Sequence, residues 1–362
     1  RPSEAGATFG TNPPEKVPTP AEHCASRDEC QYSGAQGTDG YRHLPLRSSR
    51  ASDEWIGDLL SLSDTIGDRT MSYSDNAATA AVRASLESDQ QHGAVVPPLH
   101  LSSNYTFKSL GEKREYDYTR SGNPTRTALA EALATLEGGA GAVVTSSGMA
   151  ALSLITQLLK PGDLLVAPHD CYGGTYRLFR TLADKGHFKV LFVDQTDTAA
   201  IDAACARSPN LILVETPSNP LLRIVDIEKM SAAAASCGAL LAVDNTFLSP
   251  ALQQPIALGA DLVIHSTTKY LNGHSDVVGG AVVAATDELA ERLDWWANCL
   301  GITGAPFDAY LTLRGVRTLF ARMKQHEQNA NILAELLNEH DQVARVEYPG
   351  LRNPPGHDIA AQ

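Results

Sequence analysis

The sequence predicts an α/β protein with a mostly parallel, seven-stranded sheet whose two faces are covered by helices. Two observations predict it. Between about residues 125 and 285, short apolar runs alternate with segments of helical length and composition. The runs are apolar at nearly every position, which is typical of strands buried on both faces of a parallel sheet.

The apolar runs are too short for helices and are bounded by Gly, Pro, Asn, Asp or Ser, so each is expected to be a strand. In chain order they are Ala142–Thr145, Leu164–Ala167, Val190–Val193, Leu211–Glu215, Leu240–Asp244, Leu262–His265 and Ala281–Ala284.

The segments between the runs carry helix-forming residues. Thr127–Leu136 is rich in Ala and Leu and is closed by Gly138-Gly139. Met149–Leu159 is similar and meets Pro161-Gly162, which stops it. The remaining expected helices are 174–184, Ile201–Ala206, 226–236 and a helical region from about 310 to His340.

Composition excludes several classes of protein. The chain has 362 residues, 43% of them hydrophobic, which suffices for a large core and a second, smaller domain. Its formal net charge of −13 disfavours nucleic acid and anionic membranes as partners. The sequence has no apolar run long enough to span a bilayer and no secretory signal. The six cysteines are scattered, which is typical of reduced thiols in a cytoplasmic protein.

Two residues at neighbouring strand ends suggest the chemistry. Asp244 ends an apolar strand, and Lys269 follows the next strand, 25 positions later. In such sheets ligands bind beyond the carboxyl ends of the strands. A desolvated lysine can form an imine with an aldehyde, and a nearby aspartate can keep a pyridinium nitrogen protonated, as pyridoxal phosphate (PLP) requires. Taken singly, Asp244 has an ordinary explanation as a helix cap, and Lys269 as a solvated loop residue.

Other polar residues suggest a phosphate site. Ser147-Gly148-Met149 lies between a strand and a helix, where glycine allows close approach and backbone N–H groups face an anion. Ser266 and Thr268 stand two apart in a segment expected to be extended, so their hydroxyls would share a face. A Ser-Gly turn before a helix is common, so this signal is weak by itself.

Two aromatic features complete the pattern. Tyr172 follows a strand end and precedes Gly173-Gly174, so it could stack on a pyridine ring or be a core tyrosine. The polar segment from Tyr116 to Thr125 places Arg120 near tyrosines, a pairing that suits phosphate. The alternative is an ordinary loop with a helix cap at Thr125.

Five blocks in the same order carry a family resemblance, and together they are specific. From about Met71 onward the chain resembles the Cys/Met-metabolism PLP enzymes of fold type I, and among them most the cystathionine γ-synthases. The blocks are Tyr118–Thr125, Ala167–Gly174, Glu215–Pro220, Val243–Phe247 and His265–Asp276.

The resemblance implies roles for individual residues. Lys269 would form the Schiff base with PLP and shuttle protons, assisted by Tyr172, which would also stack on the ring. Asp244 would pair with the ring nitrogen, and Asn219 would bond the phenolic oxygen. The phosphate would be bound by Gly148, Met149, Ser266 and Thr268.

The resemblance also implies an assembly and a division of the chain. Tyr118 and Arg120 would reach the phosphate of a neighbouring subunit, so the active site would need a homodimer, and two dimers would form a tetramer. Residues 71–125 would be an arm that contacts that subunit, 126–325 the large PLP-binding domain and 326–362 the start of a truncated C-terminal α/β domain. Residues 1–70 are expected to be a disordered or non-native extension. A transit peptide is the rival interpretation, disfavoured because acidic residues outnumber basic ones there.

The implied reaction is γ-replacement, in which cysteine displaces the acyl group of O-succinylhomoserine, or of O-acetylhomoserine, to give cystathionine in methionine biosynthesis by transsulfuration. Tyr118, Arg177 and Asn298 would contact the substrate, and no metal site is expected. Ser121 stands where some synthases have a second arginine, which leaves the acyl group open.

Other functions stay open. The alternatives are a cystathionine γ-lyase, an acylhomoserine sulfhydrylase, or an impaired or non-catalytic member, because the family's carboxylate-binding arginine would lie beyond Gln362. A nucleotide-binding Rossmann fold is disfavoured because no G-x-G-x-x-G follows the first strand.

Overall fold

A computed structural model describes residues 73–86, 88–352 and 355–361. The expectation for residues 1–70 therefore lies outside the described residues. Within them the predicted sheet is confirmed, with strand order β1-β7-β6-β5-β4-β2-β3. Each strand agrees with its predicted bounds to within one residue. The strands are β1 Gly141–Thr145, β2 Leu164–Pro168, β3 Lys189–Val193, β4 Leu211–Glu215, β5 Leu240–Asp244, β6 Leu262–His265 and β7 Gly280–Ala284.

Strand direction is parallel except at β7. The neighbours β3, β2, β4, β5 and β6 pair in parallel, and β7 is antiparallel to both β6 and β1. Because β7 separates them, β1 runs in the same direction as β6. The carboxyl ends of β1 and of β2 to β6 therefore lie at one edge of the sheet.

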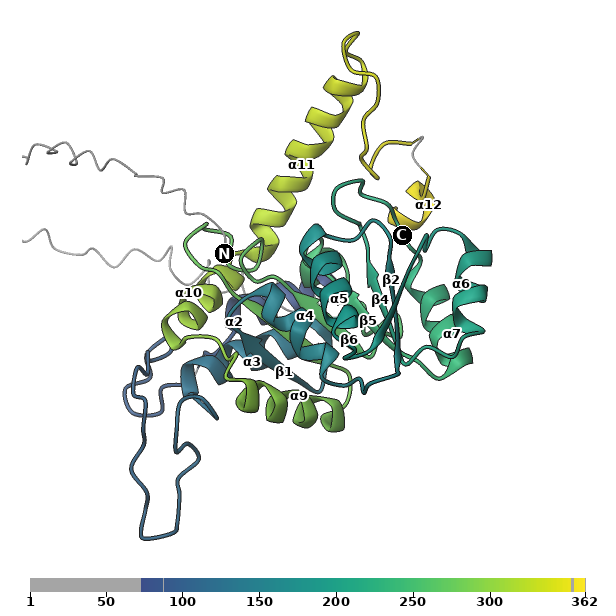
Figure 1. Cartoon of the computed structure of the whole chain (residues 1–362). Helices are drawn as coiled ribbons and strands as arrows, with labels where there is room; N and C mark the ends of the chain where they lie inside the picture. The colour runs from purple at the N-terminus through teal and green to yellow at the C-terminus, as the bar shows by residue number, and fades with distance from the viewer. Residues whose placement is uncertain (1–72, 87, 353–354, 362) are drawn as a thin grey trace, which may run out of the picture. The chain divides into compact units, whose positions relative to one another are not determined.

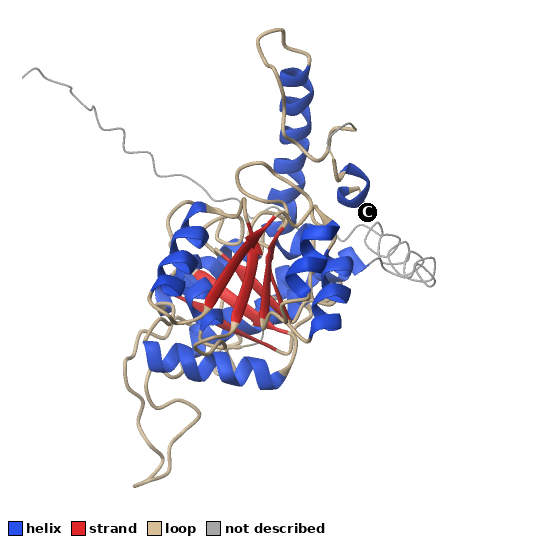
Figure 2. Ribbon diagram, turned by 45° about the vertical axis from the view of Figure 1, so that its right-hand side comes forward, coloured by secondary structure: helices blue, strands red, loops and turns tan. Residues whose placement is uncertain are grey.

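Helices cover both faces of the sheet, as Figure 2 shows. The five helices predicted before and between the first five strands are all present, although the second ends at Thr156, before the predicted Leu159. There the chain passes into turns closed by bonds between residues three apart, such as Gln157 N–H to Leu154 O. These helices are α3 Pro124–Glu137, α4 Gly148–Thr156, α5 Gly173–Asp184, α6 Thr198–Cys205 and α7 Ile227–Cys237.

Six further helices complete the described chain. The helical region expected from 310 to His340 divides into two of them, α10 and α11, while the other four were not predicted. The continuous α11 passes through the proposed domain boundary between 325 and 326. The six are α2 Tyr73–Arg83, α8 Ser249–Leu252, α9 Asp287–Leu300, α10 Pro306–Val316, α11 Leu319–Asn338 and α12 His357–Ala360.

The start and end of α3 follow from its sequence. The side chain of Asn123, and not Thr125, caps the helix by accepting hydrogen bonds from Thr125 N and Arg126 N. Gly138 ends the helix with a φ of 73°, a left-handed conformation that glycine adopts without a steric penalty.

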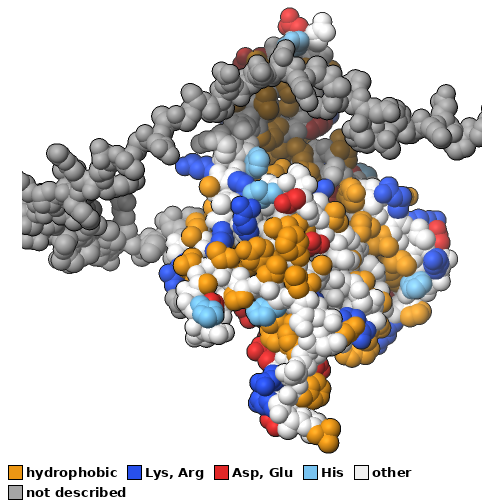
Figure 3. Space-filling model, turned by 90° about the vertical axis from the view of Figure 1, so that its left-hand side faces the viewer, with side chains coloured by type: hydrophobic (Ala, Val, Ile, Leu, Met, Phe, Trp, Pro, Cys, Tyr) orange, Lys and Arg blue, Asp and Glu red, His pale blue; other side chains and the backbone are white. Residues whose placement is uncertain are grey.

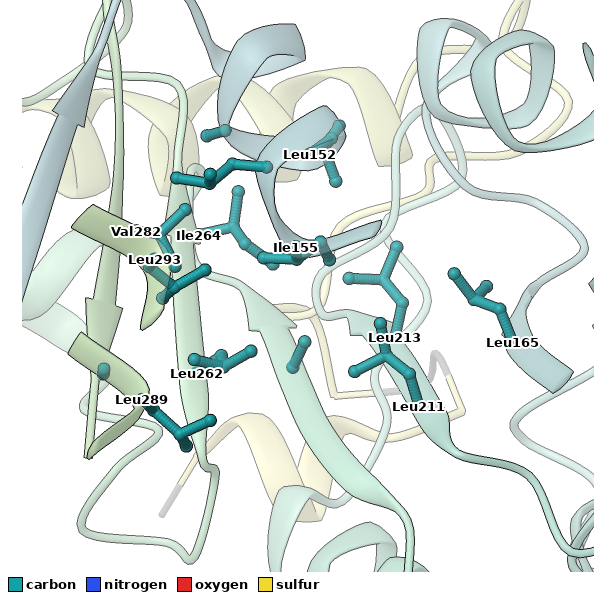
Figure 4. Close-up of a cluster of buried hydrophobic side chains, with 14 of the residues drawn as sticks. Leu152, Ile155, Leu165, Leu211, Leu213, Leu262, Ile264, Val282, Leu289 and Leu293 are labelled. Atoms are coloured by element: carbon teal, nitrogen blue, oxygen red, sulfur yellow. The ribbon is translucent and has the colours of Figure 1, made fainter. Parts of the chain in front are cut away.

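The core has a layer on each face of the sheet. On one face, α4, α5 and α9 cover alternate strand residues such as Leu211 and Leu213. Figure 4 shows side chains of this layer, among them Leu152 and Ile155 of α4, pointing toward the sheet. On the other face, α2, α3 and α10 cover the β1 side, and α6 and α7 cover residues such as Ile212 and Val214. This alternation explains why the strands are apolar throughout.

Phe179 of α5 anchors the first layer. It is fully buried and meets Phe188 edge to face, with ring centroids 6.2 Å apart. We expect Phe179→Ala to lower the free energy of unfolding by about 3–5 kcal/mol, because it removes buried contacts and leaves a cavity. Arg180→Ala, at an exposed position of the same helix, should change it by less than about 0.5 kcal/mol. Denaturant unfolding measures both, and equal effects would contradict this role for Phe179.

Two segments extend from the sheet and its helices. The long loop between α2 and α3 reaches away at the lower left of Figure 1, and α11 rises at the top. The loop exposes large apolar side chains, including Leu101, Phe107 and Leu110. Apolar atoms are also visible across the face in Figure 3. In the described part of the chain, none of the helices has the length and apolar character that crossing a membrane requires.

Candidate active site

The predicted site residues converge beyond the carboxyl ends of the strands. A cavity of about 1010 Å³ lies there, between the loops that follow β1, β2, β4, β5 and β6. Eight of the predicted residues line it. They are Gly148, Met149, Tyr172, Asn219, Asp244, Ser266, Thr268 and Lys269.

Lys269 lies in a turn and not in an extended segment. Its backbone N–H donates to Ser266 O at 3.2 Å, and Asn272 N–H donates to Thr267 O at 2.9 Å. The expectation that Ser266 and Thr268 share a face of an extended chain is therefore wrong, yet the turn still directs both to the cavity. The Lys269 side chain is exposed there. Burial by this chain alone thus does not supply the desolvation that the sequence argument used.

Asp244 ends β5 beside another acid. Its Oδ1 accepts a hydrogen bond from Thr246 N–H at 3.1 Å, and its register partner on β4 is Glu215. Burial raises the pKa of the Asp244 carboxyl, against the hydrogen bonds from Thr246, which lower it. No lysine or arginine of the described residues forms an ion pair with Asp244. A half-buried acid without a lysine or arginine partner favours binding a positively charged ligand atom.

The start of α4 approaches the Ser266 turn closely. The Ser147 hydroxyl caps the helix by accepting from Ala150 N–H at 3.1 Å. A side chain at Gly148 would place its Cβ 2.7 Å from the Ser266 Cβ, so only glycine fits. The N–H groups of Gly148 and Met149 have no intrahelical partner in an α-helix. Together with the hydroxyls of Ser266 and Thr268 they suit an anion.

Glu215 is a site residue that was not predicted from the sequence. It closes the wholly apolar β4, is 4% exposed and lines the cavity. Its carboxylate accepts from Tyr172 N–H at 2.9 Å and from Asn219 N–H at 2.7 Å. Burial and the neighbouring Asp244 raise the pKa of Glu215 to about 8. A charged residue at the end of a buried strand was the available signal.

Thr246 is another site residue that was not predicted from the sequence. Its hydroxyl accepts from Ser266 N–H at 2.8 Å, which ties the loop after β5 to the turn after β6. His326 of α11 also lines the cavity and packs on Tyr270, with ring centroids 5.3 Å apart. Neither contact could be read from the spacing of these residues.

Four predicted residues do not line this cavity. Arg120 donates from Nη1 to Asn298 O at 3.1 Å, and its guanidinium carbon lies 5.7 Å from the centre of the Tyr118 ring. Tyr118, Arg120 and Asn298 therefore lie together at the end of α9. Arg177 is an exposed residue of α5 whose Nη1 lies close to Gly173.

Comparison with known proteins identifies the family. The sequence pattern of the Cys/Met metabolism PLP-dependent enzymes matches residues 78–362. The chain belongs to this family. Its members are PLP enzymes, so the cofactor of this chain is PLP.

Individual relatives of the Cys/Met metabolism family support the assignment. The chain is 58% identical to the cystathionine γ-synthase of Escherichia coli over 79% of its own length and 74% of the relative. It is 44% identical to a cystathionine β-lyase of Lactococcus lactis, over 78% of its length and 74% of the relative. A crystal structure of cystathionine γ-synthase from Xanthomonas oryzae, in complex with cystathionine, matches with a TM-score of 0.78 and 61% identity, covering 79% of this chain and 74% of that one.

The cavity fits the family cofactor. Asp244 is a half-buried acid suited to the cationic ring nitrogen of PLP, and Lys269 presents an exposed amine to the same cavity. The close approach at Gly148 leaves helix N–H groups and the Ser266 hydroxyl available for a phosphate, whereas the Thr268 hydroxyl already donates to Gly279 O.

Cys171 lies beside the cavity as a buried thiol, and burial, with nearby acids, raises its pKa to about 12. We expect iodoacetamide at neutral pH to label Cys171 at least about a hundredfold more slowly than the exposed Cys299, because only the thiolate reacts. Mass spectrometry of native and denatured samples measures this difference. Comparable labelling of both thiols in the native chain would contradict it.

Proposed function

We propose that this chain is a cystathionine γ-synthase that joins O-succinylhomoserine and L-cysteine. The observation that carries the proposal is the identity of 58% and 61% to the synthases of Escherichia coli and Xanthomonas oryzae, above the 44% to the β-lyase relative; other synthases match at 44–47%. The cavity supports it, because it gathers eight residues to which the family resemblance gives roles in holding PLP.

Protons at the reacting carbons would be handled by two residues. Bound PLP would withdraw electrons from the substrate's α-carbon. The Nζ amine of Lys269 would remove the proton from that carbon and return it, because it reaches the cavity as an exposed amine. The Tyr172 hydroxyl would assist. The Asp244 carboxylate would hold the proton on the ring nitrogen, because a carboxylate with little access to solvent is stabilised by a cationic partner.

The remaining cavity residues would hold the cofactor in place. Asn219 would bond the phenolic oxygen. The helix N–H groups at Gly148 and Met149, with the hydroxyls of Ser266 and Thr268, would bind the phosphate. In the structure the Thr268 hydroxyl donates to Gly279 O at 3.2 Å and accepts from Gly279 N–H at 3.0 Å, so its O–H would turn from Gly279 O to the phosphate.

We propose that the enzyme works as a homodimer, two of which form a tetramer. Tyr118 and Arg120 lie away from the cavity of their own chain, as expected of residues that complete the site of a neighbour. The exposed apolar side chains of the long loop support residues 71–125 as the arm that contacts this neighbour. We propose residues 126–325 as the PLP-binding domain and residues 326–362 as the start of a second, C-terminal domain.

Substrate contacts and location complete the proposal. Arg177 is exposed beside Gly173, at the start of the helix that follows Tyr172, where it could meet a succinyl carboxylate. Tyr118 and Asn298 would contact substrate from the neighbouring subunit's side. The four described cysteines are free thiols, which supports a cytoplasmic location.

A product assay tests the proposal. The purified chain with PLP receives O-succinylhomoserine or O-acetylhomoserine, each with cysteine or sulfide, and products are separated by chromatography. A synthase forms cystathionine from the succinyl donor and cysteine, whereas a sulfhydrylase forms homocysteine from sulfide. Omitting the acyl donor is the control.

The same assay distinguishes a synthase from a lyase. The relative named as a β-lyase makes cleavage the second candidate function. Cystathionine supplied alone would then yield pyruvate with a β-lyase or 2-oxobutyrate with a γ-lyase. Rapid cleavage without any synthesis would overturn the synthase proposal.

A further inference from the structure

We propose that Glu215 is a positioning residue of the active site. Its carboxylate fixes the backbone of Tyr172 and of Asn219, two residues on different loops, in the arrangement that PLP requires. The inference rests on the proposed function, because that function gives Tyr172 and Asn219 their contacts with the cofactor.

The geometry uses both oxygens of the carboxylate. Oε2 accepts from Tyr172 N–H at 2.9 Å, and Oε1 accepts from Asn219 N–H at 2.7 Å. Tyr172 follows β2, whereas Asn219 lies in the loop after β4. Glu215 itself ends the buried β4, so its side chain is held by the sheet. One rigid group therefore sets the distance between two walls of the cavity.

Burying an ionised carboxylate at this position costs folding free energy. This cost argues against a side chain that serves only to fill space. Glu215 is buried, and the groups around it are Asp244 on the adjacent strand, Asp170 and Cys171 on the loop after β2, and Lys269 across the cavity. Its pKa is raised to about 8, chiefly by burial and then by Asp244. A neutral glutamine would avoid that cost but has only one acceptor oxygen. Only the ionised acid accepts on both oxygens.

The two loops have a second connection that does not involve Glu215. Ser218 Oγ donates to Asp170 Oδ2 at 2.8 Å, and Arg223 Nε lies 3.6 Å from the same oxygen. These contacts join the loop after β2 to the loop after β4. A variant at Glu215 should therefore keep its fold while the precise spacing of Tyr172 and Asn219 is lost.

The test compares PLP binding by the full chain and by Glu215→Gln. Above pH 8, where Glu215 is mostly ionised, we expect the variant to raise the dissociation constant of PLP by about tenfold to a hundredfold, the value of one hydrogen bond to a charged group. The thermal midpoint of the PLP-free variant should not fall. The matched control is Asp261→Asn, a carboxylate that accepts from Leu241 N–H at 2.8 Å at the opposite edge of the same sheet. It should leave the dissociation constant unchanged.

A pH series gives a readout that a purely structural role would not move. The PLP-free carboxyl is half ionised near pH 8, and only its ionised form makes both bonds. Binding should therefore tighten as pH rises through about 8 in the parent, and this part of the slope should be missing in Glu215→Gln. Asp244 is coupled to Glu215, so the missing part of the slope belongs to these two acids together.

A second variant covers the case in which glutamine prevents folding. Glu215→Asp keeps the charge but is one methylene too short to reach both amides, so we expect it too to weaken PLP binding by about tenfold or more. Parent-like affinity and pH dependence in either folded variant would overturn the inference. Failure of the parent chain itself to bind PLP would instead overturn the proposed function.

Discussion

Lys269→Ala should remove both turnover and covalent capture of PLP. We expect activity to fall by about three orders of magnitude or more, because the variant lacks the amine that binds the cofactor and moves the proton. The visible absorbance of the PLP-loaded chain should be lost as well. Borohydride reduction followed by peptide mass analysis locates the attachment site, and we expect it at Lys269 alone, the lysine that lines the cavity.

The control for this experiment is Lys185→Ala. Lys185 is an exposed residue at the end of α5 and lies outside the cavity, so its loss should change neither labelling nor activity. Reduction that attaches the cofactor to a different lysine would assign the catalytic role elsewhere.

Asp244→Asn should retain PLP yet react slowly. The asparagine amide cannot hold the ring nitrogen's proton as the carboxylate does. We therefore expect kcat to fall by about a hundredfold to a thousandfold, the usual cost of removing one well-placed electrostatic contact. Steady-state kinetics at matched PLP content measures this. Asp184→Asn, at an exposed position of α5, is the control.

The same variant should stabilise the PLP-free protein at neutral pH. Burial raises the pKa of Asp244 in the folded state, so ionising this carboxyl costs folding free energy once pH exceeds its ordinary value. Asparagine removes that cost. The gain in thermal midpoint should shrink as pH falls toward the range where the unfolded carboxyl is also protonated. A variant less stable than the parent at pH 7 would contradict this account.

The strands could be predicted because each is a short apolar run bounded by turn residues, a pattern that directly reflects burial on both faces. The four-residue helices α8 and α12 leave no periodic signal. For α9 a signal did exist, since Thr286 caps it and Asp287 and Glu288 fill its first turn.

The site was predictable as far as it depends on strand ends. Asp244 and the residues near Lys269 meet because parallel strands end at one edge. The turn at Lys269 was not predictable, because the hydrogen bonds that shape it, such as Asn272 N–H to Thr267 O, have no sequence signature. The role of Glu215 depends on two backbone amides, and these too are invisible in the sequence.

The position of β7 bears on how the chain must be made. The first strand of the sheet, β1, has β7, the last strand along the chain, as its neighbour, from Gly141 opposite Ala284 to Thr145 opposite Gly280, and a bridge joins Thr145 to the still later Thr303. A nascent chain that has not yet released Gly280 from the ribosome therefore has no partner for β1, and β6 has one unpaired edge. Unpaired edges invite association between chains. Vectorial synthesis thus leaves this sheet open until β7, its last strand along the chain, arrives, and chaperone protection would matter most in that interval.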